Sequence, residues 1–432
     1  MRFRLRDVPE MLCTPAGRLH IRHGIAYRLW PLLSRAARLY RRTVVRHTRV
    51  IAVAGSFGKS TTTRAVTAAL GAPLHRATLF NSWQWIAFAV LRIRPGQRYA
   101  VIETGISDRG QMKGYARTVR PDLVVMTAVG SEHHRSLGTL EVTRAEKSWM
   151  LQVLPASGAA VLNGDDPNVM WMKEKTRART VTFGFGDACD VRAADVRLDW
   201  PRGTRFHLSA FGEERDVTVR LIGRHMIYPV LAAIAVAGLE GFALDQTLAR
   251  LRDLPPTRGR MDPVALPNGV TVLRDDFKSS LETVHTALDV LAQVPRARRI
   301  ALLGAVSEPP GIQRQMYQAL GERVAGIASH LVVFNHEFAP YWSGARRAGM
   351  PKTSVVNAGR TVQDAAAALT QLLLPGDVLL IKGRAPEKLD RVRLILEGRK
   401  VRCDIRYCSF RTLDCVDCPM LERGWGRHRV IM

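Results

Sequence analysis

The sequence predicts an α/β fold built as two successive sheet-containing domains, and three observations indicate this. Short apolar runs typical of buried strands alternate with helical patterns between residues 49 and 400. The stretch 254–260, Leu-Pro-Pro-Thr-Arg-Gly-Arg, interrupts that alternation, because Pro and Gly disfavour regular structure. With 432 residues, 47% of them hydrophobic, the chain is long enough to form two or three packed cores.

Residues 1–48 are expected to form a basic amphipathic leader. Residues 1–50 contain twelve Arg, no Lys and two acids, a net charge of +10 within a chain total of +26. Pro31 can begin a helix, since its missing N–H is not needed at the first helical position. That helix would have one apolar and one basic face, formed by Leu32, Ala36, Leu39 and Tyr40 and by Arg35, Arg38, Arg42 and Arg46. It suits either an anionic membrane surface or docking on the next domain.

Residues 49–255 are expected to form a central domain with a mostly parallel sheet. Helical patterns at 61–70 and 140–154 lie between apolar runs, which is the order of β-α-β units. Alternating polar and apolar residues at 190–219 predict an antiparallel appendage. The predicted parallel strands are 50–53, 99–103, 123–127, 159–162 and 180–183.

Residues 256–400 are expected to form a Rossmann-like C-terminal α/β domain. Its predicted strands are 270–273, 299–303, 330–334 and 378–381, with helices at 281–291 and 362–373.

Residues 401–432 form a basic tail that holds four of the six cysteines, Cys403, Cys408, Cys415 and Cys418. Their C-x4-C-x6-C-x2-C spacing fits a tetrahedral Zn²⁺ site, and it is equally compatible with reduced thiols or with disulfides.

Composition excludes several classes of protein. The cysteines are too few and too unevenly spread for a secreted disulfide framework. No apolar run reaches the roughly 18–20 residues of a membrane span, and no signal peptide is recognisable, so we expect a cytoplasmic protein. The positive charge leaves anionic lipid, an acidic substrate or nucleic acid as partners. No nucleic-acid-binding motif is present, so nucleic acid is not expected. The sequence gives no prediction of the oligomeric state.

The strand predicted at 50–53 leads into a phosphate-binding loop. Residues 54–61 read Ala-Gly-Ser-Phe-Gly-Lys-Ser-Thr. Backbone N–H groups of such a turn and of the following helix point at an anion, Lys59 adds a positive charge, and Ser60 offers a hydroxyl to Mg²⁺. We therefore predict ATP binding by Gly55, Ser56, Phe57, Gly58, Lys59, Ser60 and Thr61. The first glycine of the commonest form of this loop is replaced by Val53.

The loop in this shorter form resembles that of the Mur ligase family, and later motifs strengthen the resemblance. Residues 101–105 read Val-Ile-Glu-Thr-Gly. Residues 130–141 contain His133, and Lys147 follows His133 by fourteen residues, within the helix predicted at 140–154. Residues 162–167, 223–225 and 376–383 are also similar to family motifs. Together these cover about residues 49–400, and their order is most similar to the branch of the family that adds D-alanyl-D-alanine to a UDP-muramoyl peptide.

The resemblance implies ATP-dependent amide formation through an acyl phosphate, with Lys59, His133 and Lys147 as catalytic residues. In the family, Ser60 and Glu103 would hold one Mg²⁺, and His133 and a carbamylated Lys147 would hold a second. A carbamate turns a cation into an anionic oxygen ligand, which suits a metal site. The family also places an arginine and an aspartate near the nucleotide, at positions that match Arg260 and Asp276.

Some residues depart from the family pattern. The branch carries an N-terminal domain that binds the UDP-sugar, whereas only 48 residues precede the loop here, so we expect this domain to be missing. Met226 and Pro229 stand where the family has two Asn residues, one of which reads adenine. Trp83 and Trp85 replace smaller side chains near the acceptor, so we expect a rebuilt acceptor pocket.

Three hypotheses therefore stay open. The first is a ligase acting on a cell-wall precursor, with a nucleotide-sugar peptide or another small anionic molecule as substrate. The second is a Mur-type ligase for another polymer, such as a capsule, polyglutamate-like or cyanophycin-like peptide. The third is a basic NTPase associated with nucleic acid, which leaves His133 and Lys147 unexplained.

Overall fold

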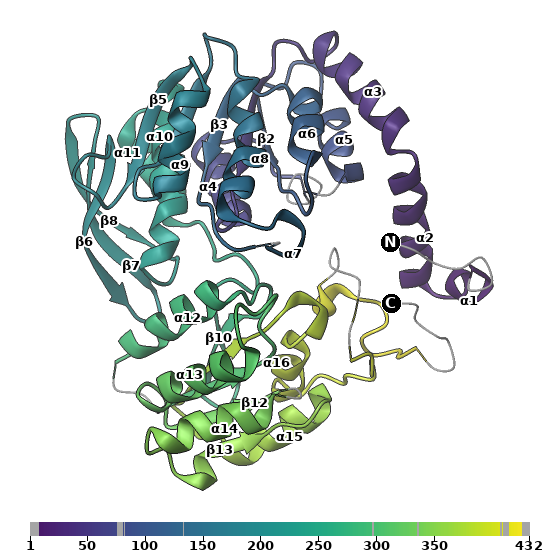
Figure 1. Ribbon diagram of the computed structural model, residues 1–432, viewed down its shortest axis with the longest axis vertical. Helices are drawn as coiled ribbons and strands as arrows, with labels where there is room; N and C mark the ends of the chain where they lie inside the picture. Colours follow the sequence, from purple (N-terminus) through teal and green to yellow (C-terminus); the bar gives the residue numbers. More distant parts are fainter. Residues whose placement is uncertain are drawn as a thin grey trace. The chain divides into compact units, whose positions relative to one another are not determined.

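The computed structural model describes residues 8–75, 81, 83–132, 134–295, 298–334, 337–406, 408 and 414–425. The chain forms two compact units (Figure 1). One is Ile25–Pro255, and the other combines Met1–Gly24 with Pro256–Met432. The chain is α/β throughout, as predicted, with one large mostly parallel sheet and a second, smaller one.

The sheet of the 25–255 unit has the strand order β2-β1-β3-β4-β5-β6-β7-β8. Its parallel part confirms the predicted strands and places β1 between β2 and β3. The antiparallel strands β6 to β8 confirm the predicted appendage. The strands are β1 Arg49–Ala54, β2 Tyr99–Glu103, β3 Leu123–Met126, β4 Ala159–Asn163, β5 Arg179–Gly184, β6 Val191–Asp199, β7 Gly203–Ala210 and β8 Glu213–Val219.

Both faces of this sheet are covered, which explains why its parallel strands read as continuous apolar runs. Alternate residues of β1 (Val50, Ala52 and Ala54) point into a core shared with one set of helices. That set is α3 Trp30–Arg42, α5 Trp83–Leu91, α6 Gln111–Val119, α8 Leu140–Gln152 and α9 Pro167–Met170. Helix α4 Lys59–Ala69 packs with α10 Ile227–Leu239 and α11 Leu244–Arg252. The short α7, His134–Leu137, precedes α8.

The sheet of the other unit has the order β13-β12-β11-β14-β10-β9, parallel except for β9 at the edge. This is the Rossmann-like arrangement that the sequence predicts. Strands are β9 Asp262–Ala265, β10 Thr271–Asp275, β11 Arg299–Leu303, β12 His330–Val333, β13 Val355–Asn357 and β14 Val378–Lys382. Helices are α12 Leu281–Gln293, α13 Gln313–Ala325, α14 Phe338–Arg347, α15 Val362–Leu372 and α16 Asp390–Leu396.

The first helices of the chain belong to both units. Helices α1 Val8–Leu12 and α2 Pro15–Arg28 precede α3, and the unit boundary falls after Gly24. Ala16 of α2 packs with the tail in a small apolar cluster formed with Cys403, Ile405, Met420 and Trp425. Arg391 of α16 is 1% exposed and donates to the carbonyl oxygens of Cys403 and Ile405 at 3.0 and 2.6 Å. The tail is therefore packed onto its unit through these backbone groups.

Helix α3 docks on its unit, but not through the face that the sequence suggests. Trp30, Leu33, Ala37 and Tyr40 pack against the core, whereas Leu32 and Leu39 are 62% and 65% exposed. The reason is Arg41, which is buried because its guanidinium donates to the carbonyl oxygens of Val45 and Arg120 and to the Asp122 carboxylate.

In the described part of the chain, no helix combines the length and apolarity needed to cross a bilayer.

Candidate functional site

The loop after β1 has the backbone that a phosphate-binding turn requires. Gly55 and Gly58 have φ of +141° and +78°, a region that favours glycine. A Cβ on Gly55 would lie 2.0 Å from Oγ1 of Thr127, at the end of the neighbouring strand. The Thr127 hydroxyl donates to the carbonyl oxygen of Phe57 at 2.6 Å, which ties the loop to β3. Gly58 then forms the N-cap of α4, so the helix N-terminus, with its unpaired N–H groups, opens at the loop.

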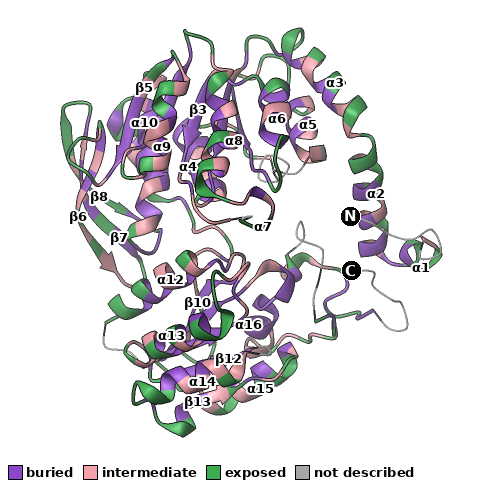
Figure 2. Cartoon of the chain, in the orientation of Figure 1, coloured by how far each residue is buried: buried purple, intermediate pink, exposed green. Residues whose placement is uncertain are grey.

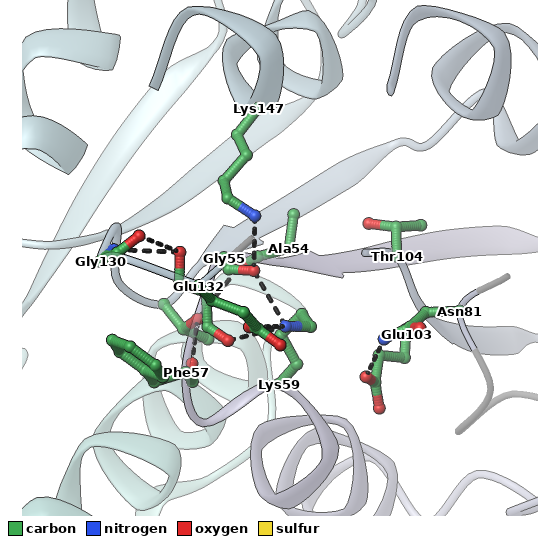
Figure 3. Close-up of polar contacts among 12 residues, drawn as sticks. Ala54, Gly55, Phe57, Lys59, Asn81, Glu103, Thr104, Gly130, Glu132 and Lys147 are labelled. Carbon is green, nitrogen blue, oxygen red and sulfur yellow. Dashed lines mark hydrogen bonds and ion pairs between the residues drawn. The ribbon is translucent and has the colours of Figure 1, made fainter. Parts of the chain in front are cut away.

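Lys59 is folded onto the loop (Figure 3). Its Nζ donates to the carbonyl oxygens of Gly55 and Ser56 at 3.0 and 2.9 Å. The same Nζ lies 3.6 Å from Oε2 of Glu132, an ion pair with both side chains largely buried. The ammonium group is thus held over the turn by three oxygens, which is where a phosphate would need its charge.

Glu103 ends β2, directly beside the loop, because it pairs in register with Val53. It is 2% exposed, and its Oε1 accepts from Nδ2 of Asn81 at 2.7 Å. Its Oε2 is buried and accepts no hydrogen bond from any residue that the structure describes. A buried carboxylate oxygen without a partner is unfavourable by about 1–3 kcal/mol or more, and Mg²⁺ prefers oxygen ligands of this kind. The donor set therefore fits a divalent cation.

Lys147 of α8 reaches the same loop from the opposite side. It is 3% exposed, and its Nζ donates to the carbonyl oxygen of Gly55 at 2.9 Å (Figure 3). Burial, and to a smaller extent the charge of Lys59, lowers the pKa of Lys147 well below its ordinary value. A neutral amine is the form that reacts with CO₂, so the environment fits the predicted carbamate.

Glu103, at the carboxyl end of β2, and Lys147 of α8 both lie next to the loop that follows β1 (Figure 3). His133 lies outside the described residues. Ser60 is half-buried in the first turn of α4.

Arg260 and Asp276 both lie in the other unit. The Arg260 guanidinium stacks 4.7 Å from the centroid of the Phe277 ring. Asp276 is 6% exposed and lies 3.3 Å from the Arg274 guanidinium.

The Arg274 guanidinium lies 3.3–3.6 Å from three carboxylates, those of Asp262, Asp276 and Asp390. Burial, together with the Asp276 charge, raises the pKa of Asp390 to about 6 against the opposing effect of Arg274. The charges of Lys388 and Arg393, both buried, also act on Asp390 and favour its ionised form.

Met226 and Pro229 are both buried at the start of α10, so neither offers a side chain to a ligand there. Between them, Tyr228 donates its hydroxyl to Asp165 at 2.9 Å and packs edge-on against Phe185. Asp165 also accepts from the backbone N–H groups of Phe185 and Gly186, and Arg224 stacks on the Phe185 ring at 4.0 Å.

The two tryptophans that we expected to rebuild the acceptor pocket have other partners. The Trp83 ring packs edge-on against Trp30 and Tyr115, with centroids 5.1 and 5.2 Å apart, and Trp85 packs against Phe88. Trp83 therefore links α3 to the core, and the rebuilt acceptor pocket stays a prediction.

The tail cysteines Cys403, Cys408, Cys415 and Cys418 are free thiols. Within the ranges that the structure describes, no group of three or more His, Cys, Asp or Glu side chains is arranged to hold a metal ion. The Zn²⁺ prediction therefore gains no support from the geometry.

Sequence reasoning missed three groups around the loop, Asn81, Thr127 and Glu132. Thr127 could have been found from its position at the carboxyl end of the strand next to the loop. Glu132 stands beside His133 in the sequence, and Asn81 lies two residues before Trp83. The contact between Asn81 and Glu103 requires Gly105, because a Cβ there would lie 2.7 Å from Nδ2 of Asn81.

The chain is similar to known proteins over most of its length. The model of the Mur ligase middle domain matches residues 53–237, and that of the Mur ligase glutamate ligase domain matches residues 259–385. The UDP-N-acetylmuramoyl-tripeptide–D-alanyl-D-alanine ligase of Mycobacterium bovis is 32% identical over 357 residues, which are 77% of this chain and 70% of that protein. The Escherichia coli (strain K12) ligase of the same name is 28% identical over 286 residues, 65% of this chain and 63% of the relative.

Solved structures give the same result for the fold. A crystal structure of MurF from Acinetobacter baumannii superposes with a TM-score of 0.76 at 22% identity, covering 86% of this chain and 81% of that one. MurF from Thermotoga maritima in complex with ADP gives 0.73 at 22% identity, covering 85% and 83%.

Proposed function

The chain belongs to the Mur ligase family, and we propose that it joins D-alanyl-D-alanine to a UDP-muramoyl peptide, as MurF does. It is an ATP-dependent ligase that forms amide bonds. The 32% identity with a ligase of that name over 77% of the chain supports the substrate. The observation that carries the chemistry is the buried Oε2 of Glu103, which has no hydrogen-bond partner among the described residues and lies beside a loop whose carbonyl oxygens bind two lysines.

We propose the following roles in the reaction for residues of the loop and for the other residues of the candidate site. The backbone N–H groups of the turn and α4 bind phosphate oxygens, and the Lys59 ammonium balances their charge. Ser60 and Glu103 would hold one Mg²⁺, and His133 with carbamylated Lys147 a second. These ions would neutralise charge while the γ-phosphoryl group moves from ATP onto the substrate carboxylate and ADP is released. The resulting acyl phosphate is attacked by the amine, and phosphate leaves.

Arg260 and Asp276 are proposed to contact the nucleotide. Support for both is their match to family positions and their place beside Phe277 and Arg274. Because the reaction consumes ATP, we propose that the enzyme works in the cytoplasm.

A ligase for another polymer remains the second candidate. Its support is the pair Trp83 and Trp85 in the segment expected near the acceptor, although the Trp83 ring also packs against Trp30 and Tyr115. The nucleic-acid-associated NTPase has no support beyond charge.

The test is phosphate release from ATP by the purified protein. We expect release only when a UDP-muramoyl tripeptide and D-alanyl-D-alanine are both supplied, and none from a Glu103→Gln variant, which keeps the side-chain shape but loses the charge. Release with a different acid and amine pair would favour the second candidate. If a broad panel of acids yields neither a new amide nor a hydroxylamine-trappable acyl group, the proposal fails.

Zinc in the tail stays a prediction that rests on the spacing of the four cysteines alone. Metal analysis decides it, because a Cys415→Ser/Cys418→Ser variant with the zinc content of the parent would remove the site.

A further inference from the structure

A row of apolar side chains lies on the outside of the 25–255 unit, where helices normally show polar residues. Ile25, Leu29, Leu32 and Leu39 are 49%, 44%, 62% and 65% exposed, and Ala36 between them is exposed too. Their spacing of four, three, four and three residues puts them on one face of the helical segment. We name these five residues the α3 stripe. Figure 2 shows exposed segments along α3.

The orientation of the stripe is fixed by what lies behind it. On the inner face, Trp30 packs edge-on against Trp83 and Tyr115, and the Tyr40 hydroxyl donates to the carbonyl oxygen of Ile93 at 2.7 Å. Arg41 is bound on the same face by backbone carbonyls and Asp122. Rotating the helix to bury the leucines would break these contacts, so the stripe is a stable feature of the surface.

Positive charge accompanies the stripe. Arg28, Arg35 and Arg42 repeat every seven residues beside it, and all three are exposed, as is Arg46 after the helix. The sequence contains no Asp or Glu between Glu10 and Glu103. Residues 11–102 therefore carry no carboxylate that an anionic surface would repel.

We propose that the α3 stripe lies in the headgroup region of an anionic lipid membrane, with the flanking arginines on lipid phosphates. An amphipathic helix lying in the interface combines these two properties, and each basic residue near an anionic surface adds to the attraction. From residue 25 to residue 39 the stripe is about 21 Å long at 1.5 Å per residue. A single long apolar ridge without acids suits a flat, fluid, anionic surface better than a folded partner. This proposal is independent of the ligase substrate.

Flotation with lipid vesicles tests the proposal on the purified full-length protein. Vesicles contain phosphatidylcholine with about 30% phosphatidylglycerol, or phosphatidylcholine alone. We expect the parent to float with the anionic vesicles only, and a Leu32→Gln/Leu39→Gln variant to bind at least about tenfold more weakly. An Arg35→Gln/Arg42→Gln variant should lose affinity most at low salt, because salt screens these charges.

A matched control is Ile312→Gln/Leu374→Gln, which changes two apolar residues of similar exposure (63% and 57%) in the other unit. It should float like the parent. Equal flotation of the parent and the Leu32→Gln/Leu39→Gln variant, or no flotation of the parent, overturns the proposal. So does a dimer of the parent, seen by light scattering, that this variant abolishes without any vesicle binding, since the stripe would then join two copies.

Discussion

At the scale of single residues, the two lysines at the phosphate-binding loop differ in what their surroundings allow. Lys59 has the Glu132 carboxylate at 3.6 Å, whereas Lys147 donates only to a carbonyl oxygen among the contacts described, and burial lowers its pKa. The first is suited to remain a cation and the second to become a carbamate.

Replacing Lys147 should separate catalysis from folding. Lys147→Met removes a buried amine but keeps its length, so we expect unchanged or higher thermal stability and turnover lower by about 10²–10³. Lys147→Ala leaves space, and added acetate should restore part of its activity by supplying an anionic oxygen. An exposed Lys173→Ala variant serves as the control. Full activity of either Lys147 variant, measured as phosphate release, would contradict the carbamate.

Asp390 predicts a pH dependence of stability. Its pKa is raised from 3.8 to about 6 in the folded protein, so the folded state binds this proton more tightly than the unfolded state. The stabilisation is complete below about pH 4 and is lost as the pH rises through about 6. The free energy of unfolding of Asp390→Asn, relative to the parent, should therefore increase from pH 4 to pH 6.5, by about 1–3 kcal/mol. Urea unfolding across this range measures it, and Asp253→Asn, at an exposed position, should follow the parent.

At the scale of secondary-structure elements, α3 shows that a charged residue can decide which face of a helix is buried. Arg41 donates to backbone carbonyl oxygens and to one carboxylate, and these acceptors belong to two segments, the turn after α3 and residues 119–122. If Leu32 and Leu39 were buried instead, Arg41 would face outward, and its guanidinium would lose these acceptors and be hydrated by water.

Neighbouring arginines of α3 allow a paired test. Arg41→Leu should lower the free energy of unfolding by about 2–3 kcal/mol, because it leaves Asp122 and several carbonyl groups with one donor fewer. Arg42→Leu, one residue along on the exposed face, should change it by less than about 0.5 kcal/mol. Denaturant unfolding followed by tryptophan fluorescence measures both. Equal effects of the two substitutions would mean that the Arg41 contacts do not hold the helix.

Much of the element order was predictable. The parallel strands and the loop could be predicted because a buried parallel strand is a continuous apolar run and a phosphate-binding turn needs glycines at fixed places. The outward direction of Leu32 and Leu39 could not, since periodicity defines a stripe but not its partner. The position of Trp83 could not either, because its neighbours Trp30 and Tyr115 are distant in sequence.

At the scale of the whole molecule, sequence motifs located the groups of the candidate site better than they located the supporting contacts. Glu103 and Lys147 were identified from family motifs, and both lie beside the phosphate-binding loop. Asn81, which binds Glu103, and Thr127, which holds Phe57, act through tertiary contacts that one chain's motifs do not reveal. Partner side chains and backbone carbonyls are brought together only by the fold.

The division of the chain also has a mechanical consequence. The backbone passes between the two units twice, after Gly24 within α2 and again after Pro255. Two units connected by a single segment could rotate freely about it, whereas two connecting segments allow only the rotations that both segments can follow. Any change in the relative placement of the units must therefore be absorbed at both crossings, the segment that follows Gly24 and the one that follows Pro255.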